Sequence, residues 1–316
     1  MGCPGKLDLL ESLIKDHPLP HNKSCQYPMY PQDVSGFAEP PNDTTNKLMS
    51  GQLRTLAAAL LGLIGWIVFN FRPDAYLAYI ILSQFVRKNC TELVWAGILR
   101  LAHYLVSTKT LELTYRRMIS PEASPEWAMT TDSALFSASH GGSIAGYAIG
   151  IHIGKNIDGQ DIPNAPIIWR SYAQDAVVDS SGAAELTALA TGYKALLGLR
   201  LNLIELNLLP DLPIPVFTDS EAIRLGAISG KITRAMKYLA ARYQMVRQGV
   251  RDKIIALRSI PAPQNKSDAL TKPTIGQDFK LKRSELLGIP ISQIDERLKQ
   301  LAAPPSTKQV HFTDSN

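Results

Sequence analysis

The sequence has little cysteine and no apolar leader, and both absences restrict what the protein can be. Its three cysteines, Cys3, Cys25 and Cys90, are odd in number and share no spacing typical of a metal site. Neither a disulfide framework nor a zinc site is therefore predicted. Residues 1–48 contain no apolar run, so no secretory signal peptide is predicted. We expect an intracellular protein, cytoplasmic or nuclear, that is not secreted.

The chain as a whole also lacks a large excess of one charge, since its formal net charge is only +5. Basic residues nevertheless concentrate between positions 231 and 258, where Asp252 is the single acid. They are Lys231, Arg234, Lys237, Arg242, Arg247, Arg251, Lys253 and Arg258. Such a stripe is compatible with a polyanionic partner.

Long hydrophobic runs are scarce, and only residues 55–71 resemble a membrane segment. This run carries no formal charge, but it is short for a spanning helix and contains Asn70. It continues directly into Arg72, Pro73 and Asp74. We therefore expect a buried helix and no membrane partner.

The chain divides into four regions by its local patterns. Residues 1–48 contain many prolines, which break long elements, and are expected to form a poorly ordered leader. Residues 49–118 show helical spacing of apolar residues and predict a small helical unit. Residues 119–275 show strands followed by helices. Residues 276–316 are expected to form a short helix and a frayed tail.

The pattern within residues 119–275 predicts an α/β fold with a mixed five-stranded sheet. Runs typical of strands at 129–136, 144–153 and 165–169 predict an antiparallel meander. A helix with a regular apolar stripe follows Ser180, and the apolar run 214–218 leads straight into another helix. A strand that feeds a helix in this way is typical of a parallel sheet. A basic helix at 231–247 then precedes a last strand at 253–257.

Four carboxylates occur where this order of elements would bring them together. Asp132 lies in the first strand, Glu185 in the first turn of the first helix, Asp219 at the end of the fourth strand and Asp268 at the start of the final helix. Strand ends and helix starts of such a sheet meet at one edge. Carboxylates that converge on two Mg²⁺ ions can hydrolyse a phosphodiester, so the arrangement predicts a two-metal site.

Each acid also has an ordinary structural interpretation, which the positions alone leave open. Glu185 would interact favourably with the helix dipole, and Asp268 would do so in its own first turn. Thr218 and Glu221 have the spacing of a capping box around Asp219.

The local sequence around the acids favours the catalytic interpretation. The blocks are TDSA at 131–134, SSGAAELTAL at 180–189, FTDSEAI at 217–223 and KSDALTK at 266–272. Together, and in this order, they resemble the signature blocks of the ribonuclease H domain in copia-type LTR-retrotransposon Pol polyproteins. KYLAARY at 237–243 is similar to the basic helix of that family, and FRPD at 71–74 with LSQF at 82–85 resembles its reverse transcriptase thumb and connection region.

The resemblance covers about residues 49–288 and implies a ribonuclease H-like fold preceded by a helical thumb or connection region. It implies an endonuclease that uses two Mg²⁺ ions, with Mn²⁺ as an alternative, to cut the RNA strand of an RNA–DNA hybrid. The four acids would be the catalytic metal ligands, and the phosphate backbone would be held by Lys231, Arg234, Lys237 and Arg242. A reverse transcriptase palm and fingers supplied elsewhere would be a further partner.

The sequence departs from the family pattern in several places. No adjacent pair of Asp residues occurs, so polymerase activity is not expected. Residues 258–266 contain no histidine, and Ala240 stands where the basic helix usually carries an acid. The missing reverse transcriptase half and Ala240 favour an alternative, which is a catalytically inactive remnant that binds RNA or RNA–DNA hybrid. A transposase or integrase would need Asp, Asp, Glu in that order, and here Glu185 comes second.

Overall fold

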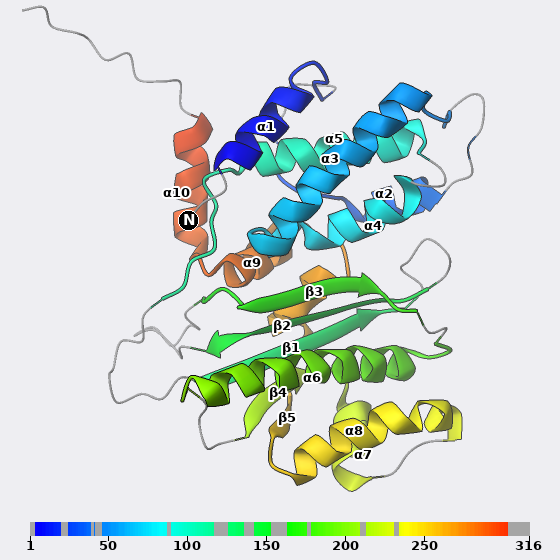
Figure 1. Ribbon diagram of the computed structural model, residues 1–316, viewed down its shortest axis with the longest axis vertical. Coiled ribbons are helices and arrows are strands. Elements are labelled where there is room, and N and C mark those ends of the chain that lie inside the picture. The colour runs from blue at the N-terminus through cyan, green and yellow to red at the C-terminus, as the bar shows by residue number, and fades with distance from the viewer. Residues whose placement is uncertain are drawn as a thin grey trace, which may run out of the picture.

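The computed structural model describes residues 4–19, 25–38, 41, 46–86, 90–116, 126–135, 142–152, 163–175, 178–208, 213–230 and 234–302. These residues form three layers, with one set of helices above a five-stranded sheet and a second set below it (Figure 1).

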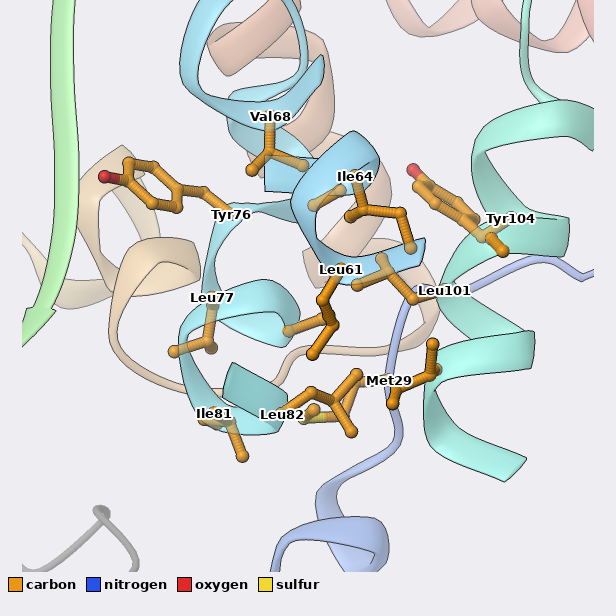
Figure 2. Packing of buried hydrophobic residues seen from close by; sticks show 14 of the residues in the cluster. Met29, Leu61, Ile64, Val68, Tyr76, Leu77, Ile81, Leu82, Leu101 and Tyr104 are labelled. Carbon is orange, nitrogen blue, oxygen red and sulfur yellow. The ribbon is translucent and has the colours of Figure 1, made fainter. Parts of the chain in front are cut away.

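The upper helical layer is built mainly from α3 (Gly51–Asn70), α4 (Tyr76–Val86) and α5 (Glu92–Ser107). A short 3-10 helix, η1 (Pro73–Ala75), joins α3 to α4. The Ser50 side chain accepts a hydrogen bond from the Leu53 N–H and so caps α3, and Thr91 caps α5 through the Val94 N–H. Leu, Ile and Val side chains from the three helices pack against one another in the core of this layer (Figure 2). The helical unit predicted for residues 49–118 is thus present.

The helix α3 is, in the described part of the chain, the one helix long and apolar enough to cross a membrane. Length and composition alone are weak evidence, since a core helix passes the same test. Its Leu60 and Ile64 are fully buried in the helical layer, whereas Trp66 and Phe69 are 43% and 46% exposed. The expected buried helix is therefore buried on one face only.

The prediction of a poorly ordered leader was wrong for much of residues 1–48. Residues Pro4–Ile14 form α1 and Pro31–Ala38 form α2. Both helices begin at a proline, which fits a first helical position because the N–H there has no partner within the helix. Leu10 of α1 and Phe37 of α2 are buried in the core of the helical layer. Two of the prolines, Pro4 and Pro31, therefore start helices here. Residues 1–3, 20–24, 39–40 and 42–45 of this region lie outside the described residues.

The central sheet has the order β3-β2-β1-β4-β5. Its strands are β1 (Glu126–Ala134), β2 (Ile144–His152), β3 (Ile168–Ala173), β4 (Ile214–Thr218) and β5 (Ile255–Ser259). The first three strands pair antiparallel, while β4 pairs parallel with β1 and with β5. The predicted mixed sheet, with an antiparallel meander followed by helix–strand units, is confirmed.

Two strands begin later than the sequence pattern predicts. Ala165 donates its N–H to the Thr114 carbonyl, and Pro166 has no N–H, so β3 begins only at Ile168. Lys253 has a positive φ of 56° after the preceding helix, so β5 begins at Ile255. In both cases a local backbone feature displaces the start of pairing.

The lower layer consists of α6 (Ser181–Glu205), α7 (Glu221–Ser229), η2 (Arg234–Leu239) and α8 (Ala240–Arg251). Gly192 lets α6 lie close to the sheet, because a Cβ there would come within 3.1 Å of Met129 Sδ and 3.2 Å of Tyr147 Cβ. The predicted basic helix is not continuous, since a 3-10 segment precedes α8 and residues 231–233 are not described.

The carboxyl-terminal region is folded rather than frayed up to residue 302. After η3 (Ala262–Gln264) and η4 (Lys266–Leu270) come α9 (Gly276–Leu287) and α10 (Ile291–Ala302). Phe279 and Leu286 of α9 belong to the same apolar cluster as the upper helices, Ile144 of β2 and Leu270 of η4. The expectation of a short helix and tail from residue 276 was wrong because α9 completes this shared core. Residues 303–316 lie outside the described part.

Candidate metal centre

Three of the four predicted acids lie together at one edge of the sheet. Ligand oxygens of Asp132, Glu185 and Asp219 all lie within 4.8 Å of one another. The parallel register aligns Met129 of β1 with Val216 of β4, so Asp132 and Asp219 each lie three residues farther along neighbouring strands. Glu185 comes from the first turns of α6, which packs on β1.

Asp132 is fully buried and only partly paired. Its Oδ2 accepts a hydrogen bond from Thr271 Oγ1 and lies 3.4 Å from Lys272 Nζ. Its Oδ1 is buried with no hydrogen-bond partner among the described residues. Burial raises the pKa of Asp132 to about 6, although Lys272 and Thr271 act in the opposite direction. One carboxylate oxygen is thus available at the centre of the cluster.

Glu185 is held by the backbone of β1. Its Oε1 accepts a hydrogen bond of 3.3 Å from the Ser133 N–H, while its Oε2 is buried without a partner in the described residues. Burial, and then the charges of Asp132 and Asp219, raise the pKa of Glu185 to about 8. Three carboxylates that repel one another in this way would be stabilised by a cation between them.

Asp219 lies just after β4 and is half-buried. The capping-box interpretation of its neighbours is not borne out by the contacts. Thr218 Oγ1 accepts a hydrogen bond of 3.2 Å from the Ser220 N–H, and the exposed Glu221 carboxylate pairs with Arg224 at 2.5 Å instead of reaching back to the helix start.

Asp268 is not a member of this group of three, although it is close to it. It lies in η4, where its Oδ1 is 2.8 Å from Lys272 Nζ and its Oδ2 accepts a hydrogen bond from Lys282 Nζ. Because Lys272 also contacts Asp132, one ammonium group connects the fourth acid to the cluster. Neither lysine was among the predicted site residues. Lys272 is in the KSDALTK block, but nothing in the sequence indicated that Lys282 would contact Asp268.

The four residues predicted to bind nucleic acid differ in how far the structure describes them. Lys231 lies outside the described residues, and the side chain of Arg234 in η2 is not described. Lys237 is exposed. Arg242 is half-buried, and its Nη1 donates to Thr187 Oγ1 of α6 at 3.3 Å. Lys237 therefore presents a charge to solvent, whereas Arg242 is partly engaged within the protein.

The donor set fits a hard divalent cation. All three clustered ligands are carboxylates, and two of their buried oxygens have no other partner in the described part of the chain. Mg²⁺ and Mn²⁺ prefer such oxygen ligands, whereas zinc sites generally include histidine or cysteine. The residues present therefore fit the Mg²⁺ or Mn²⁺ that the sequence predicts.

The strand order, the register and the acids at the edge of the sheet define a ribonuclease H-like α/β fold. No protein-family model matches the sequence. Over 218 residues, 68% of the chain, it is 24% identical to the "Retrovirus-related Pol polyprotein from transposon RE2" of Arabidopsis thaliana. This match spans only 14% of that polyprotein's length. The similarity confirms the resemblance to transposon Pol polyproteins.

Solved structures with similar folds are ribonucleases H. One is LC11-RNase H1, isolated from compost by a metagenomic approach, in complex with an RNA/DNA hybrid (19% identity, TM-score 0.32). Another is RNase H1 from Halobacterium salinarum NRC-1 (15% identity, TM-score 0.29). Each match covers 46% of this chain and 93% of the other.

Proposed function

We propose that the chain is a divalent-metal-dependent endonuclease that hydrolyses the RNA strand of RNA–DNA hybrids. The observation that carries this proposal is the cluster of Asp132, Glu185 and Asp219, in which the first two each have a buried oxygen without a partner among the residues that the structure describes. We further propose a copia-type retrotransposon origin, on the four sequence blocks, and a thumb- or connection-like role for the upper helical layer.

The proposed roles follow from the contacts. Asp132, Glu185 and Asp219 would hold Mg²⁺ or Mn²⁺, with Asp268 as a fourth ligand after release from its lysines. Bound ions of this kind lower the pKa of water and stabilise the charge on the leaving oxygen. Thr271 orients Asp132 through its hydrogen bond, and the Ser133 N–H fixes Glu185. The exposed Lys237 would contact the phosphate backbone.

A second candidate, an inactive remnant that binds RNA or RNA–DNA hybrid, is favoured by one observation. Lys272 and Lys282 already neutralise Asp268, so the fourth acid is paired without any metal ion. A chain in this state would retain basic residues for binding while its site held fewer ions than catalysis needs.

Incubation of the purified chain with a hybrid whose RNA strand is end-labelled separates the two candidates. We expect internal cleavage of that RNA with Mg²⁺ or Mn²⁺ and none with EDTA. The same RNA, single-stranded or paired with RNA, should stay intact. Binding to the hybrid without cleavage under any metal condition would support the remnant, and loss of both would contradict both candidates.

A further inference from the structure

A pocket of about 620 Å³ lies among the amino-terminal segment, the end of α5 and the two carboxyl-terminal helices. Its walls include Glu11 of α1, Thr108 after α5, Phe279 and Arg283 of α9, and Leu298 of α10. Figure 1 shows α1, α9 and α10 on the same side of the upper helical layer. None of the four predicted acids lines this pocket.

Arg283 brings a buried positive charge to the wall of this pocket. The residue is only 4% exposed, and its Nε is buried without a hydrogen-bond partner among the described residues. Its guanidinium lies over the Phe279 ring, 5.1 Å from the ring centroid, but it makes no ion pair with any described acid. A buried charge without a partner is costly, so a counter-anion would stabilise it.

Asp74, a buried carboxylate that interacts electrostatically with Arg283, is already hydrogen-bonded to other residues. Asp74 accepts hydrogen bonds from Arg72 Nε at 2.9 Å, from Arg72 Nη2 at 2.8 Å and from Tyr104 Oη at 2.5 Å. Burial would raise the pKa of Asp74, yet it is lowered, mainly by Arg72 and to a smaller degree by Tyr104 and Arg283. The Asp74 carboxylate is therefore already paired with Arg72, and no ion pair compensates the charge of Arg283 within the described part of the chain.

The other charges that line the pocket are paired with one another. Lys109 Nζ lies 2.9 Å from Glu11, and Lys280 Nζ lies 3.6 Å from Asp295. With these pairs neutral, Arg283 leaves the lining with a net charge of one positive unit. A singly charged anion matches this balance better than a dianionic phosphate does.

We propose that this pocket binds a small monocarboxylate with an aromatic or aliphatic body, whose carboxylate pairs with Arg283. The planar guanidinium suits a carboxylate in two-point contact. Tyr27, Phe279 and Leu298 provide apolar surface for the body of the ligand. The volume lies within the range of roughly 300–1,000 Å³ common for small-molecule sites. This site is independent of the proposed nuclease.

The first test is calorimetric titration of the full chain with three matched probes. We expect saturable binding of 4-phenylbutyrate, with affinity reduced about tenfold or more for the neutral 4-phenylbutanol. Phenyl phosphate should bind no more tightly than the carboxylate. Absence of binding by 4-phenylbutyrate, equal binding of the alcohol, or tighter binding of the phosphate would each overturn the proposal.

The second test uses variants that change one basic side chain at a time. Arg283→Gln should weaken 4-phenylbutyrate binding about tenfold, and Arg283→Lys should weaken it less because the charge remains. Lys299→Gln of α10 is the matched control, since Lys299 is an exposed cation that does not line the pocket, and the affinity of this variant should stay within roughly threefold of the parent. Circular dichroism checks that each variant is folded. If Arg283→Gln does not fold, the affinity of Arg283→Lys is the test of the proposal. If a folded Arg283 variant bound 4-phenylbutyrate with unchanged affinity, Arg283 would not be the anion-binding group of the pocket and the proposal would be overturned.

Discussion

Lys282 of α9 and Asp268 of η4 form an ion pair that joins the carboxyl-terminal helix to the candidate metal centre. Lys282 is only 3% exposed and also lies 3.0 Å from Asp278. The charge of Asp268 is therefore compensated from two sides, by Lys282 and by the more exposed Lys272. This arrangement sets the fourth acid apart from Asp132 and Glu185, each of which has one buried oxygen without a partner among the described residues.

Lys282→Met should make the centre bind more metal. Removing this ammonium leaves Asp268 with Lys272 alone, so the carboxylate becomes a better ligand for a divalent ion. Breaking a buried pair should cost about 3 kcal/mol of unfolding free energy without metal, and Mg²⁺ should recover part of it. Equilibrium dialysis with Mn²⁺ and melting with and without Mg²⁺ measure both effects. Lys280→Met is the control, and an equal response to metal in both variants would contradict the expectation.

Asp219→Asn should abolish cleavage of the hybrid while leaving the fold and hybrid binding largely intact. The substitution keeps the shape of a half-buried side chain but removes one negative charge from the ligand set. The free energy of unfolding should change by no more than about 1 kcal/mol. Cleavage rate, hybrid affinity and melting temperature are measured together. Glu221→Gln, two residues away and exposed, should cleave normally, and cleavage by the Asp219 variant would remove this residue from the site.

Without metal, the stability of the protein should decrease as the pH rises. Burial raises the pKa of Glu185 from 4.5 to about 8, so the folded state holds its proton more tightly than the unfolded state. The resulting stabilisation is complete below pH 4.5 and is lost as the pH rises to about 8. Asp132, whose pKa is raised from 3.8 to about 6, lowers the stability in the same way as the pH rises through that range.

Glu185→Gln should therefore confine this decrease to the acidic part of the range, where Asp132 still titrates. Denaturant unfolding in EDTA across the pH range measures the effect for parent and variant. Two superimposable profiles would show that Glu185 does not have the raised pKa.

Lys237→Ala should lower the affinity for hybrid without lowering the melting temperature. Lys237 is exposed, so its loss should reduce the slope of log affinity against log salt by about one. Arg242→Ala should also destabilise the protein by about 1 kcal/mol, because Arg242 donates to Thr187 of α6. Fluorescence anisotropy at several salt concentrations, together with melting curves, distinguishes the two. Unchanged affinity and slope in both variants would make this face an ordinary solvated surface.

The strands and the clustered acids could be predicted because the relevant signals are local. Alternating and fully apolar runs marked the five strands, and the order of elements placed Asp132 and Asp219 at positions that meet at one edge of the sheet. The pairing of β1 with β4, which makes the two strands neighbours, is known only from the structure. The errors in the predicted starts of β3 and β5 came from single backbone features, which are the proline at 166 and the left-handed conformation of Lys253. Proline also misled the interpretation of the leader, since Pro4 and Pro31 begin helices.

The pairing of Asp268 could not be predicted, because it depends on contacts between distant elements. Lys282 reaches Asp268 only after α9 has packed against the shared core through Phe279 and Leu286. No pattern around residue 282 distinguishes this buried lysine from the half-buried Lys280 two positions earlier. Which lysine is buried against Asp268 thus depends on tertiary packing, and the sequence alone does not show it.

The apolar cluster that joins the upper helices to β2, η4 and α9 has a consequence for cooperativity. Since Ile144, Leu270 and Leu286 share one continuous interior with α3 and α5, the helical layer cannot separate without exposing the upper face of the sheet to water. Heating should consequently melt the two layers in a single transition, with equal calorimetric and van't Hoff enthalpies. Residues 119–275 alone would lack this interior, so the helices on either side of them in the sequence are part of the same folding unit.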